Sequence, residues 1–295
     1  MRRPLFTRVT GRRRSTCGAV LALGLLLVGC EGGRFSADLA TDAPGDPQIA
    51  RVEVSLLGLE FRKSDGTNAT LEFNTGEIVN LLDLLSGSPL RLFTSEKLPD
   101  GTYTGVRLLF DPAQDAVAVT ADGNEFPVLL ADGAFAVADF TVNQNDSSRE
   151  SLTLTLDLRQ SLSFDDGNDE YTLTPLLRSV RTREAAQIEG NVNVTCPVGT
   201  SLTQGGAVYL FVGEDVTPDD LDDAVTEPYA TSSVVVDSVT GQLTYALRFL
   251  PAGNYTLALT CRGDADDPGA DDDLEFRSIS NVQIDAGDIV TRNLN

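Results

Sequence analysis

The chain has 295 residues, of which 41% are hydrophobic, and its 44 acidic side chains outnumber 22 basic ones to give a net charge of −22. Such an acidic surface repels nucleic acid and anionic lipid head groups, so no nucleic-acid partner is expected. The sequence contains no histidine, which excludes the usual Ser-His-Asp and Cys-His catalytic arrangements and removes the commonest ligand of zinc, copper and haem.

Residues 1–29 have the order of a secretory signal peptide: an arginine-rich start, an apolar stretch from Ala19 to Val28 and a small residue before the cut. The apolar run is too short for a membrane-spanning helix, which needs about 20 residues. The segment holds six arginines and no acid, so its removal leaves 16 basic and 44 acidic side chains and a net charge near −28.

Cys30 ends the run Leu27-Val28-Gly29-Cys30, which resembles a bacterial lipobox. The resemblance implies that Cys30 is lipidated (palmitate among its acyl chains) and becomes the first mature residue, so the membrane is a partner through an N-terminal lipid. One acyl chain holds a protein only marginally, so stable anchoring implies more than one. Glu31 follows the cysteine and, by resemblance to sorted lipoproteins, favours the outer membrane. The alternative is a plain cleaved signal with Cys30 beside it by chance. Residues 30–41 are predicted to be a lipidated tether.

A first β domain is expected over residues 42–184 because its hydrophobic pattern has a period of two. Leu152 to Leu158 alternate apolar and polar residues, as in a strand with one buried face. The alternation changes phase between Leu56 and Leu57, which predicts a β-bulge or a strand that passes between two sheets. Frequent turn sequences and no long helical period favour a sandwich or barrel. Residues 78–85 suit either a strand or a short helix.

The pattern pauses at residues 183–187, and a second β domain is expected over residues 185–295. The sequence Leu98-Pro99-Asp100-Gly101-Thr102-Tyr103-Thr104 is echoed by Leu250-Pro251-Ala252-Gly253-Asn254-Tyr255-Thr256, each before an apolar strand. Proline and glycine make a tight turn, and the tyrosine begins the strand that follows. The echo predicts two similar β domains; the alternative is a common hairpin sequence used twice by chance.

The remaining cysteines are predicted to form a disulfide. Cys17 leaves with the signal peptide and Cys30 takes the lipid, so Cys196 and Cys261 remain in an oxidising compartment. Both fall in the inward phase of predicted strands. A bridge between them would stabilise the fold by about 4 kcal/mol in the chain-entropy model. The alternative is two buried free thiols.

An acidic loop from Asp264 to Glu275 is the best chemical candidate. Asp264, Asp266, Asp272 and Glu275 take the first, third, ninth and twelfth positions of an EF-hand calcium loop, with Gly269 at the sixth. Pro268 replaces an oxygen ligand, however, and the flanks resemble strands rather than helices. The alternative is a solvated acidic hairpin loop. No other cofactor is expected. Upstream, Thr217-Pro218-Asp219-Asp220 has the cap and first turn of a short helix.

Two family resemblances follow from these segments. Residues of about 38–183 resemble the bacterial lipoprotein domain-of-unknown-function family numbered 4382. The segments that carry this resemblance are Thr41-Asp42-Ala43-Pro44, the Val52-to-Phe61 run, Val79 to Leu85 and Leu98 to Phe110. That family brings no established activity. Residues 188–295 resemble transthyretin-like or carboxypeptidase-regulatory-like β-sandwich modules through Leu250-Pro251-x-Gly253-x-Tyr255. This resemblance implies a fold and hardly constrains function.

The sequence therefore predicts an all-β protein of two β-sandwich-like domains, anchored by lipid in the cell envelope, at the outer membrane. It is expected to be a non-enzymatic binding or scaffolding protein with an envelope protein or glycan as partner. One alternative is a calcium-stabilised surface adhesion module. A more remote alternative is a carboxylate-dependent hydrolase, for which the sequence offers only abundant acids.

Overall fold

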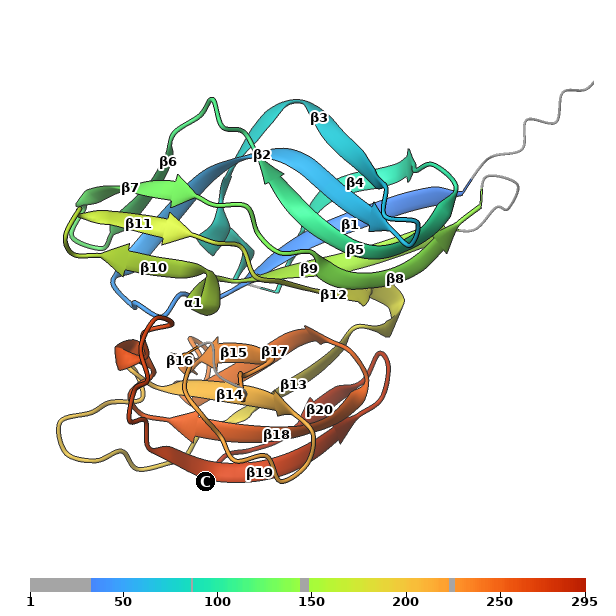
Figure 1. The fold of residues 1–295 in the computed structure, drawn as a ribbon. Coiled ribbons are helices and arrows are strands. Elements are labelled where there is room, and N and C mark those ends of the chain that lie inside the picture. Colours follow the sequence, from blue (N-terminus) through green and yellow to red (C-terminus); the bar gives the residue numbers. More distant parts are fainter. Residues whose placement is uncertain (1–32, 86, 144–148, 223–225) are drawn as a thin grey trace, which may run out of the picture.

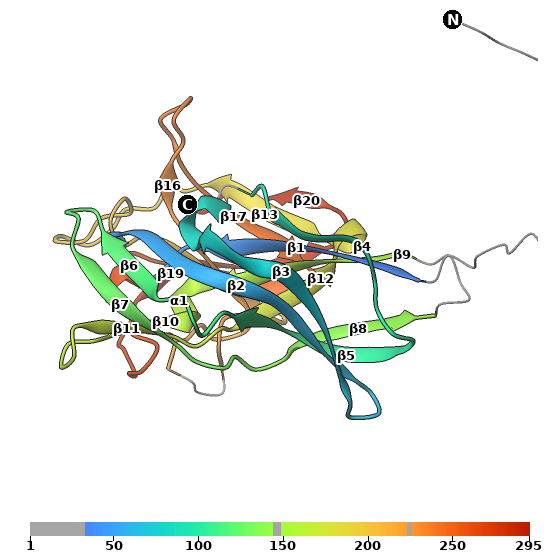
Figure 2. The same ribbon diagram turned by 90° about the horizontal axis from the view of Figure 1, so that it is seen from above.

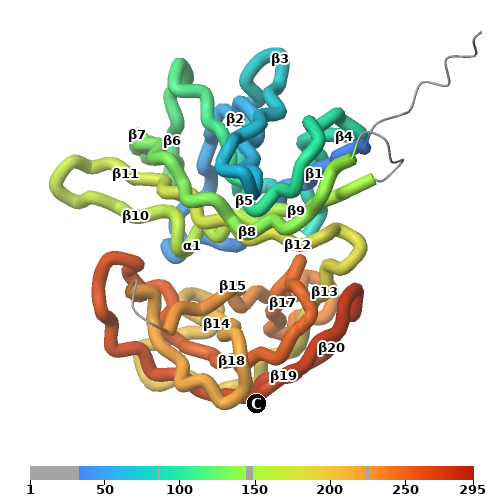
Figure 3. The backbone as a smooth tube through the Cα atoms, turned by 45° about the vertical axis from the view of Figure 1, so that its right-hand side comes forward, coloured from blue at the N-terminus to red at the C-terminus, as the bar shows by residue number. Residues whose placement is uncertain are grey.

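The structure is a computed structural model that describes residues 33–85, 87–143, 149–222 and 226–295. The signal peptide and Cys30 lie outside the described residues. The chain forms two β lobes, one above the other, and the all-β prediction is confirmed (Figure 1). It passes between the lobes through the segment that joins β12 to β13 (Figure 3). In the described part of the chain, no helix has the length and apolar character that a membrane span requires.

The N-terminal lobe packs two sheets around one core. The first sheet has the order β12-β9-β1-β4 and contains β1 (Arg34–Asp42), β4 (Leu90–Lys97), β9 (Arg149–Asp157) and β12 (Leu177–Arg181). The second has the order β10-β11-β7-β6-β2-β5-β8, with β3 also paired to β2. Its strands are β2 (Ile49–Lys63), β3 (Asn68–Asn80), β5 (Gly101–Phe110), β6 (Ala116–Thr120), β7 (Glu125–Leu130), β8 (Ala136–Val142), β10 (Leu162–Asp165) and β11 (Glu170–Leu173).

The tether prediction is wrong for residues 34–41, which form most of the central strand β1. This strand pairs in parallel with β9 and antiparallel with β4, and Phe35, Ala37 and Leu39 are fully buried. Apolar residues at every second position had carried the signal of a strand with one buried face. The physical reason for the difference is burial: the strand contributes core side chains, so it belongs to the domain rather than to a linker.

Two local predictions are resolved in this lobe. The phase change at Leu56 and Leu57 is confirmed as a bulge, because the pairing of β2 with both β3 and β5 shifts register between Leu56 and Gly58. Residues 78–85 were predicted as either a strand or a short helix, and the structure contains part of each. Strand β3 runs to Asn80, and a 3-10 turn, Leu81–Leu84, follows it; the Asn80 side chain accepts a hydrogen bond from the Leu82 backbone N–H.

The C-terminal lobe is a sandwich of two four-stranded sheets. One has the order β16-β17-β13-β20, and the other β15-β14-β18-β19. The strands are β13 (Ala186–Asn191), β14 (Ala207–Val212), β15 (Ala230–Ser233), β16 (Val235–Val236), β17 (Leu243–Leu250), β18 (Gly253–Thr260), β19 (Phe276–Ile284) and β20 (Ile289–Thr291). The β16–β17 hairpin projects away from both lobes (Figure 2).

The echoed sequences adopt the same contact in both lobes. The Tyr103 hydroxyl donates to the Pro99 carbonyl at 2.6 Å, and the Tyr255 hydroxyl donates to the Pro251 carbonyl at 2.8 Å. Both tyrosine rings are buried. The hydroxyl therefore fastens the turn to the strand that leaves it, and this gives a physical reason for the shared spacing.

Candidate functional site

The junction between the lobes is built around a buried arginine. Arg178 of β12 forms an ion pair with Asp42 at the end of β1, and its other terminal nitrogen donates to the Arg248 carbonyl at 3.3 Å. Its guanidinium also lies over the ring of Tyr229, 5.9 Å from the centroid. One side chain from the N-terminal lobe thus contacts two segments of the C-terminal lobe.

A second arginine enters the C-terminal lobe from the helical turn α1 (Leu158–Ser161). Arg159 is buried, donates to the Gly263 carbonyl and lies over the ring of Tyr209, 5.8 Å from its centroid. Its neighbour Gln160 donates from Nε2 to the Pro228 carbonyl at 3.1 Å. Buried charged groups that are paired in this way hold a specific arrangement, because loss of one partner leaves the other unsatisfied in a medium of low polarity.

Asp157 caps the turn α1 and lies within the same junction. Its carboxylate accepts from the Gln160 backbone N–H at 3.1 Å and from Gln160 Nε2 at 2.9 Å. Burial, followed by the negative charge of Asp42, raises the pKa of Asp157 to about 6, against a lowering effect of Arg178. The junction therefore contains a carboxyl group whose pKa lies about two units above that of an ordinary aspartate.

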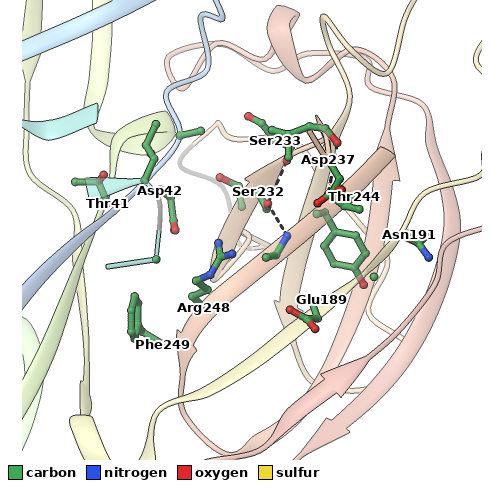
Figure 4. Close-up of a pocket in the computed structure, with 18 of the residues that line it drawn as sticks. Thr41, Asp42, Glu189, Asn191, Ser232, Ser233, Asp237, Thr244, Arg248 and Phe249 are labelled. Atoms are coloured by element: carbon green, nitrogen blue, oxygen red, sulfur yellow. Dashed lines mark hydrogen bonds between the residues drawn. The ribbon is translucent and has the colours of Figure 1, made fainter. Parts of the chain in front are cut away.

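A cleft of about 630 Å³ lies beside this junction, and both lobes line it. Thr41, Asp42 and Gly87 belong to the N-terminal lobe, whereas most of the lining comes from β13, β15 and β17. Figure 4 shows Arg248 in the middle of the labelled side chains, with Phe249 beside it. The volume falls in the usual range of small-molecule sites, roughly 300–1,000 Å³.

A β-bulge presents two successive side chains to this cleft. In the pairing of β13 with β17, Ala186 faces Leu250 and Ile188 faces Leu247, so Gln187 faces both Arg248 and Phe249. Phe249 has a φ of 55°, in the left-handed region that non-glycine residues rarely adopt. The bulge cancels the strict alternation of a strand, and both residues line the cleft.

The sequence contains a signal for this bulge, because the adjacent apolar residues Phe249 and Leu250 break the alternation that Tyr245 and Leu247 begin. Tyr245 and Leu247 are buried at a spacing of two, but the next buried residue of β17 is Leu250, at a spacing of three. This is the same phase change that had indicated the bulge in β2. No sequence pattern indicates the cleft, because its lining comes from residues 41–87 and 189–293, which are brought together only by the packing of the two lobes.

The predicted disulfide is present in the structure. Cys196 follows β13, and Cys261 follows β18, with Cα atoms 5.9 Å apart. The bond therefore joins a segment next to one sheet of the C-terminal sandwich to a segment next to the other. Its role is structural, because Cys261 belongs to the hydrophobic core of that lobe.

The structure brings together two of the four residues predicted as calcium ligands. Carboxylate oxygens of Asp266 and Asp272 lie within 4.8 Å of each other and of an oxygen of Asp220. Asp264 and Glu275 fall outside the acidic groups found among the described residues, and Glu275 instead pairs with Arg277 at 2.6 Å.

Hydrogen bonds already hold this acidic group. Asp266 accepts from the Tyr209 hydroxyl and from the Leu221 backbone N–H, and Asp220 accepts from the backbone N–H of Asp272. Burial raises the pKa of Asp266 above its ordinary value. The carboxylates thus tie the acidic loop to the segment around Asp220.

Asp220 was predicted to lie in the first turn of a short helix, and that prediction is wrong for the described residues 217–222, which form no helix. The physical reason is tertiary contact. The backbone N–H of Val216 donates to Thr256 Oγ1 at 3.1 Å, and Asp220 bonds to Asp272. These bonds replace the local ones that a marginal single-turn helix would make.

Comparisons with known proteins give one family match. Residues 33–175 match the family model described as "Domain of unknown function (DUF4382)". This match supports the resemblance of the N-terminal lobe to that family. A search of the curated proteins found no match.

Several solved structures show a distant similarity. The Bacillus anthracis TIE protein is 11% identical with a TM-score of 0.19, over 90% of this chain and 34% of that one. A putative adhesin from Bacteroides ovatus is 9% identical with a TM-score of 0.20, over 85% and 78% of the two chains. The minor pilin GBS52 from Streptococcus agalactiae is 11% identical with a TM-score of 0.20, over 88% and 94%. This chain therefore spans about a third of the first of these proteins.

Proposed function

We propose that this protein is a lipid-anchored, non-enzymatic envelope protein that binds an envelope protein or glycan in the cleft between its two lobes. The observation that carries the proposal is a cleft lined by both lobes beside a junction of buried polar contacts. Because Arg159 and Arg178 hold the lobes against each other, the cleft exists before a ligand arrives. A preformed site binds more tightly, since little ordering is left to be done on association.

The end of the N-terminal lobe supports the anchored topology. Strand β1 begins at Arg34, four positions after Cys30, a span of at most about 14 Å. The cross-strand partners of Arg34 are Lys97 on β4 and Arg149 on β9. Three cations therefore meet where the chain leads to the predicted lipid, in a chain that is otherwise strongly acidic. Cations next to an anchor attract anionic head groups.

The anchor is tested by metabolic labelling with a radioactive fatty acid. The wild-type protein should carry the label and sediment with the outer membrane, whereas Cys30→Ala should lose the label and remain soluble. Equal labelling of both proteins would contradict the anchor.

The binding function is tested on an array of envelope oligosaccharides and envelope proteins. Wild-type protein should bind a defined class of them, and Ser233→Phe, which fills the cleft, should lose that binding. Ser163→Phe makes the same change at an exposed position of β10 and should bind normally. Melting curves must show that both variants fold. Binding that survives Ser233→Phe, or an array without any binding, would refute the proposal.

A second candidate is a calcium-stabilised surface adhesion module, favoured by the convergence of Asp220 with Asp266 and Asp272. Oxygen ligands suit calcium, and an ion would relieve the repulsion among these carboxylates. Addition of calcium after EDTA treatment should then raise the melting temperature. Asp220→Asn should abolish that rise, and Asp273→Asn, in the acidic loop but outside the group, should keep it. An unchanged melting temperature in the wild-type protein would exclude this candidate.

A further inference from the structure

We propose that the cleft recognises a carboxylate carried on a hydroxylated body, such as an acidic sugar, and that Arg248 binds the carboxylate. The inference rests on the proposed function, because it names the ligand class of the same cleft. It follows from the environment of Arg248 and from the character of the remaining lining.

Arg248 is a half-buried cation whose guanidinium has no partner among the residues that the structure describes. Among residues 33–295, so far as the structure describes them, most cations bond to a carboxylate, to a backbone carbonyl or to an aromatic face. Lys97, Arg149 and Arg262 have no such contact, but all three are exposed to water. Arg248 differs because its side chain is half-buried and lines the cleft.

A guanidinium that is both half-buried and unpaired among the described residues is unusual in so acidic a chain, where 44 carboxylates compete for few cations. Partial burial removes part of its hydration, and that loss has to be offset by an anion or by hydrogen-bond acceptors. The planar guanidinium presents two parallel N–H donors, a geometry that matches a carboxylate. A ligand carboxylate would therefore supply the partner that the described residues do not.

The local backbone holds Arg248 in this position. The bulge at Arg248 and Phe249 turns both side chains toward the cleft, with Phe249 in the left-handed region. Gly87 approaches from the other lobe with a φ of +77°, and a Cβ added there would lie 2.7 Å from Arg248 Nε. The absence of a side chain at Gly87 thus leaves room for the guanidinium. Backbone strain of this kind is commonly retained at binding sites.

The charge balance of the cleft favours a ligand with one negative charge at this point. Asp42 is already neutralised by Arg178, Glu189 accepts from Gln187 Nε2 at 2.6 Å, and Asp237 accepts from its own turn at Thr240. A phosphate monoester carries almost two negative charges at neutral pH, more than the one guanidinium of Arg248 can neutralise. A carboxylate carries one charge and matches the guanidinium of Arg248, the one cation in the lining without a partner among the described residues.

The rest of the lining suits a hydroxylated body. Ser232, Ser233 and Thr244 provide hydroxyls, and Asn191 and Asn293 provide amides. Thr231 also lines the cleft, and its buried Oγ1 has no hydrogen-bond partner among the described residues. Neutral donors and acceptors beside the ring of Phe249 are a combination that a sugar can use, through its hydroxyls on one side and its C–H face on another.

The test compares two probes that differ only in charge: trigalacturonate and its fully methyl-esterified form. Calorimetry with the mature protein should show tighter binding of the acid, by about 10- to 100-fold, since a hydrogen bond to a charged group contributes that much. Arg248→Gln should remove this difference, and Arg248→Lys should restore only part of it. Arg262→Gln removes an exposed unpaired cation outside the cleft and should bind like the wild type.

Two results would overturn the inference and leave the proposed function standing. One is equal binding of acid and ester with no effect of Arg248→Gln. The other is stronger competition by galactose 6-phosphate than by galacturonate, which would make the cleft a phosphate site. Failure of the proposed function would give a different result, because Ser233→Phe would then leave the binding of every compound on the array unchanged.

Discussion

Asp157 should stabilise the folded protein at low pH and destabilise it as the pH rises, which is the reverse of the usual effect of a carboxylate. Asp157→Asn should remove this pH dependence. The substitution keeps an oxygen that can accept from the Gln160 backbone N–H but removes the acceptor for Gln160 Nε2. Loss of that second bond should cost about 1 kcal/mol at every pH. The substitution also has a pH-dependent effect, because it removes a carboxylate whose burial raises the pKa of Asp157 to about 6.

The magnitude follows from the shift between the unfolded and folded states. From 3.8 to about 6 is roughly two pKa units, which corresponds to about 3 kcal/mol. The folded protein holds the proton more tightly than the unfolded chain, so the contribution of Asp157 to stability is present below about pH 4. It is lost as the pH rises through 6. The amide cannot ionise and loses nothing over this range.

The measurement is the free energy of unfolding in urea, followed by tyrosine fluorescence at several values between pH 4 and 7.5 with the disulfide intact. The variant should be about 1 kcal/mol less stable than the wild type at pH 4 and about 2 kcal/mol more stable at pH 7.5. Asp166→Asn, in the exposed turn after β10, controls for the general loss of one charge. A difference that stays constant with pH, or falls as the pH rises, would refute the reasoning about burial.

Three further predictions concern the fold. Tyr103→Phe and Tyr255→Phe should each lower the free energy of unfolding by about 1 kcal/mol, because each removes one hydroxyl bond to a turn carbonyl; equal stability to the wild type would contradict this role. Replacement of both Cys196 and Cys261 by serine should lower it by about 4 kcal/mol, and the wild type in reducing agent should match the variant. Gly58→Ala should prevent normal folding, since its Cβ would lie 2.1 Å from the Leu71 carbonyl oxygen; a native circular dichroism spectrum would argue against it.

Features that depend on neighbours in the sequence were predictable. The phase change at Leu56 and Leu57 indicated a bulge because side chains alternate strictly in a regular strand, and the register of β2 contains that bulge. The disulfide followed from the inward phase of both cysteines, which a bridge in the core of a sandwich requires. These inferences needed only the periodicity of a strand and the count of cysteines.

Features that depend on contacts between distant segments were not predictable. Asp220 lies next to Asp272 because a loop and an irregular segment 52 residues apart in the chain fold together, and a local capping pattern cannot show this. The alternation in residues 34–41 indicates at most a strand with one buried face, and only their place between β4 and β9 shows that the middle of the strand is buried on both faces. In both cases tertiary contacts outweighed local preference.

The junction, rather than either lobe alone, is where the unusual chemistry of this chain gathers. Acidic side chains outnumber basic ones by 44 to 22 in this protein, and yet three arginines, Arg159, Arg178 and Arg248, lie at the junction or in the cleft beside it. Two have partners that fix the lobes against each other. The third lies in the space that this fixed arrangement leaves open, and its guanidinium has no partner among the described residues. A junction that served stability alone would pair or exclude that third charge, so the arrangement favours a ligand as its partner.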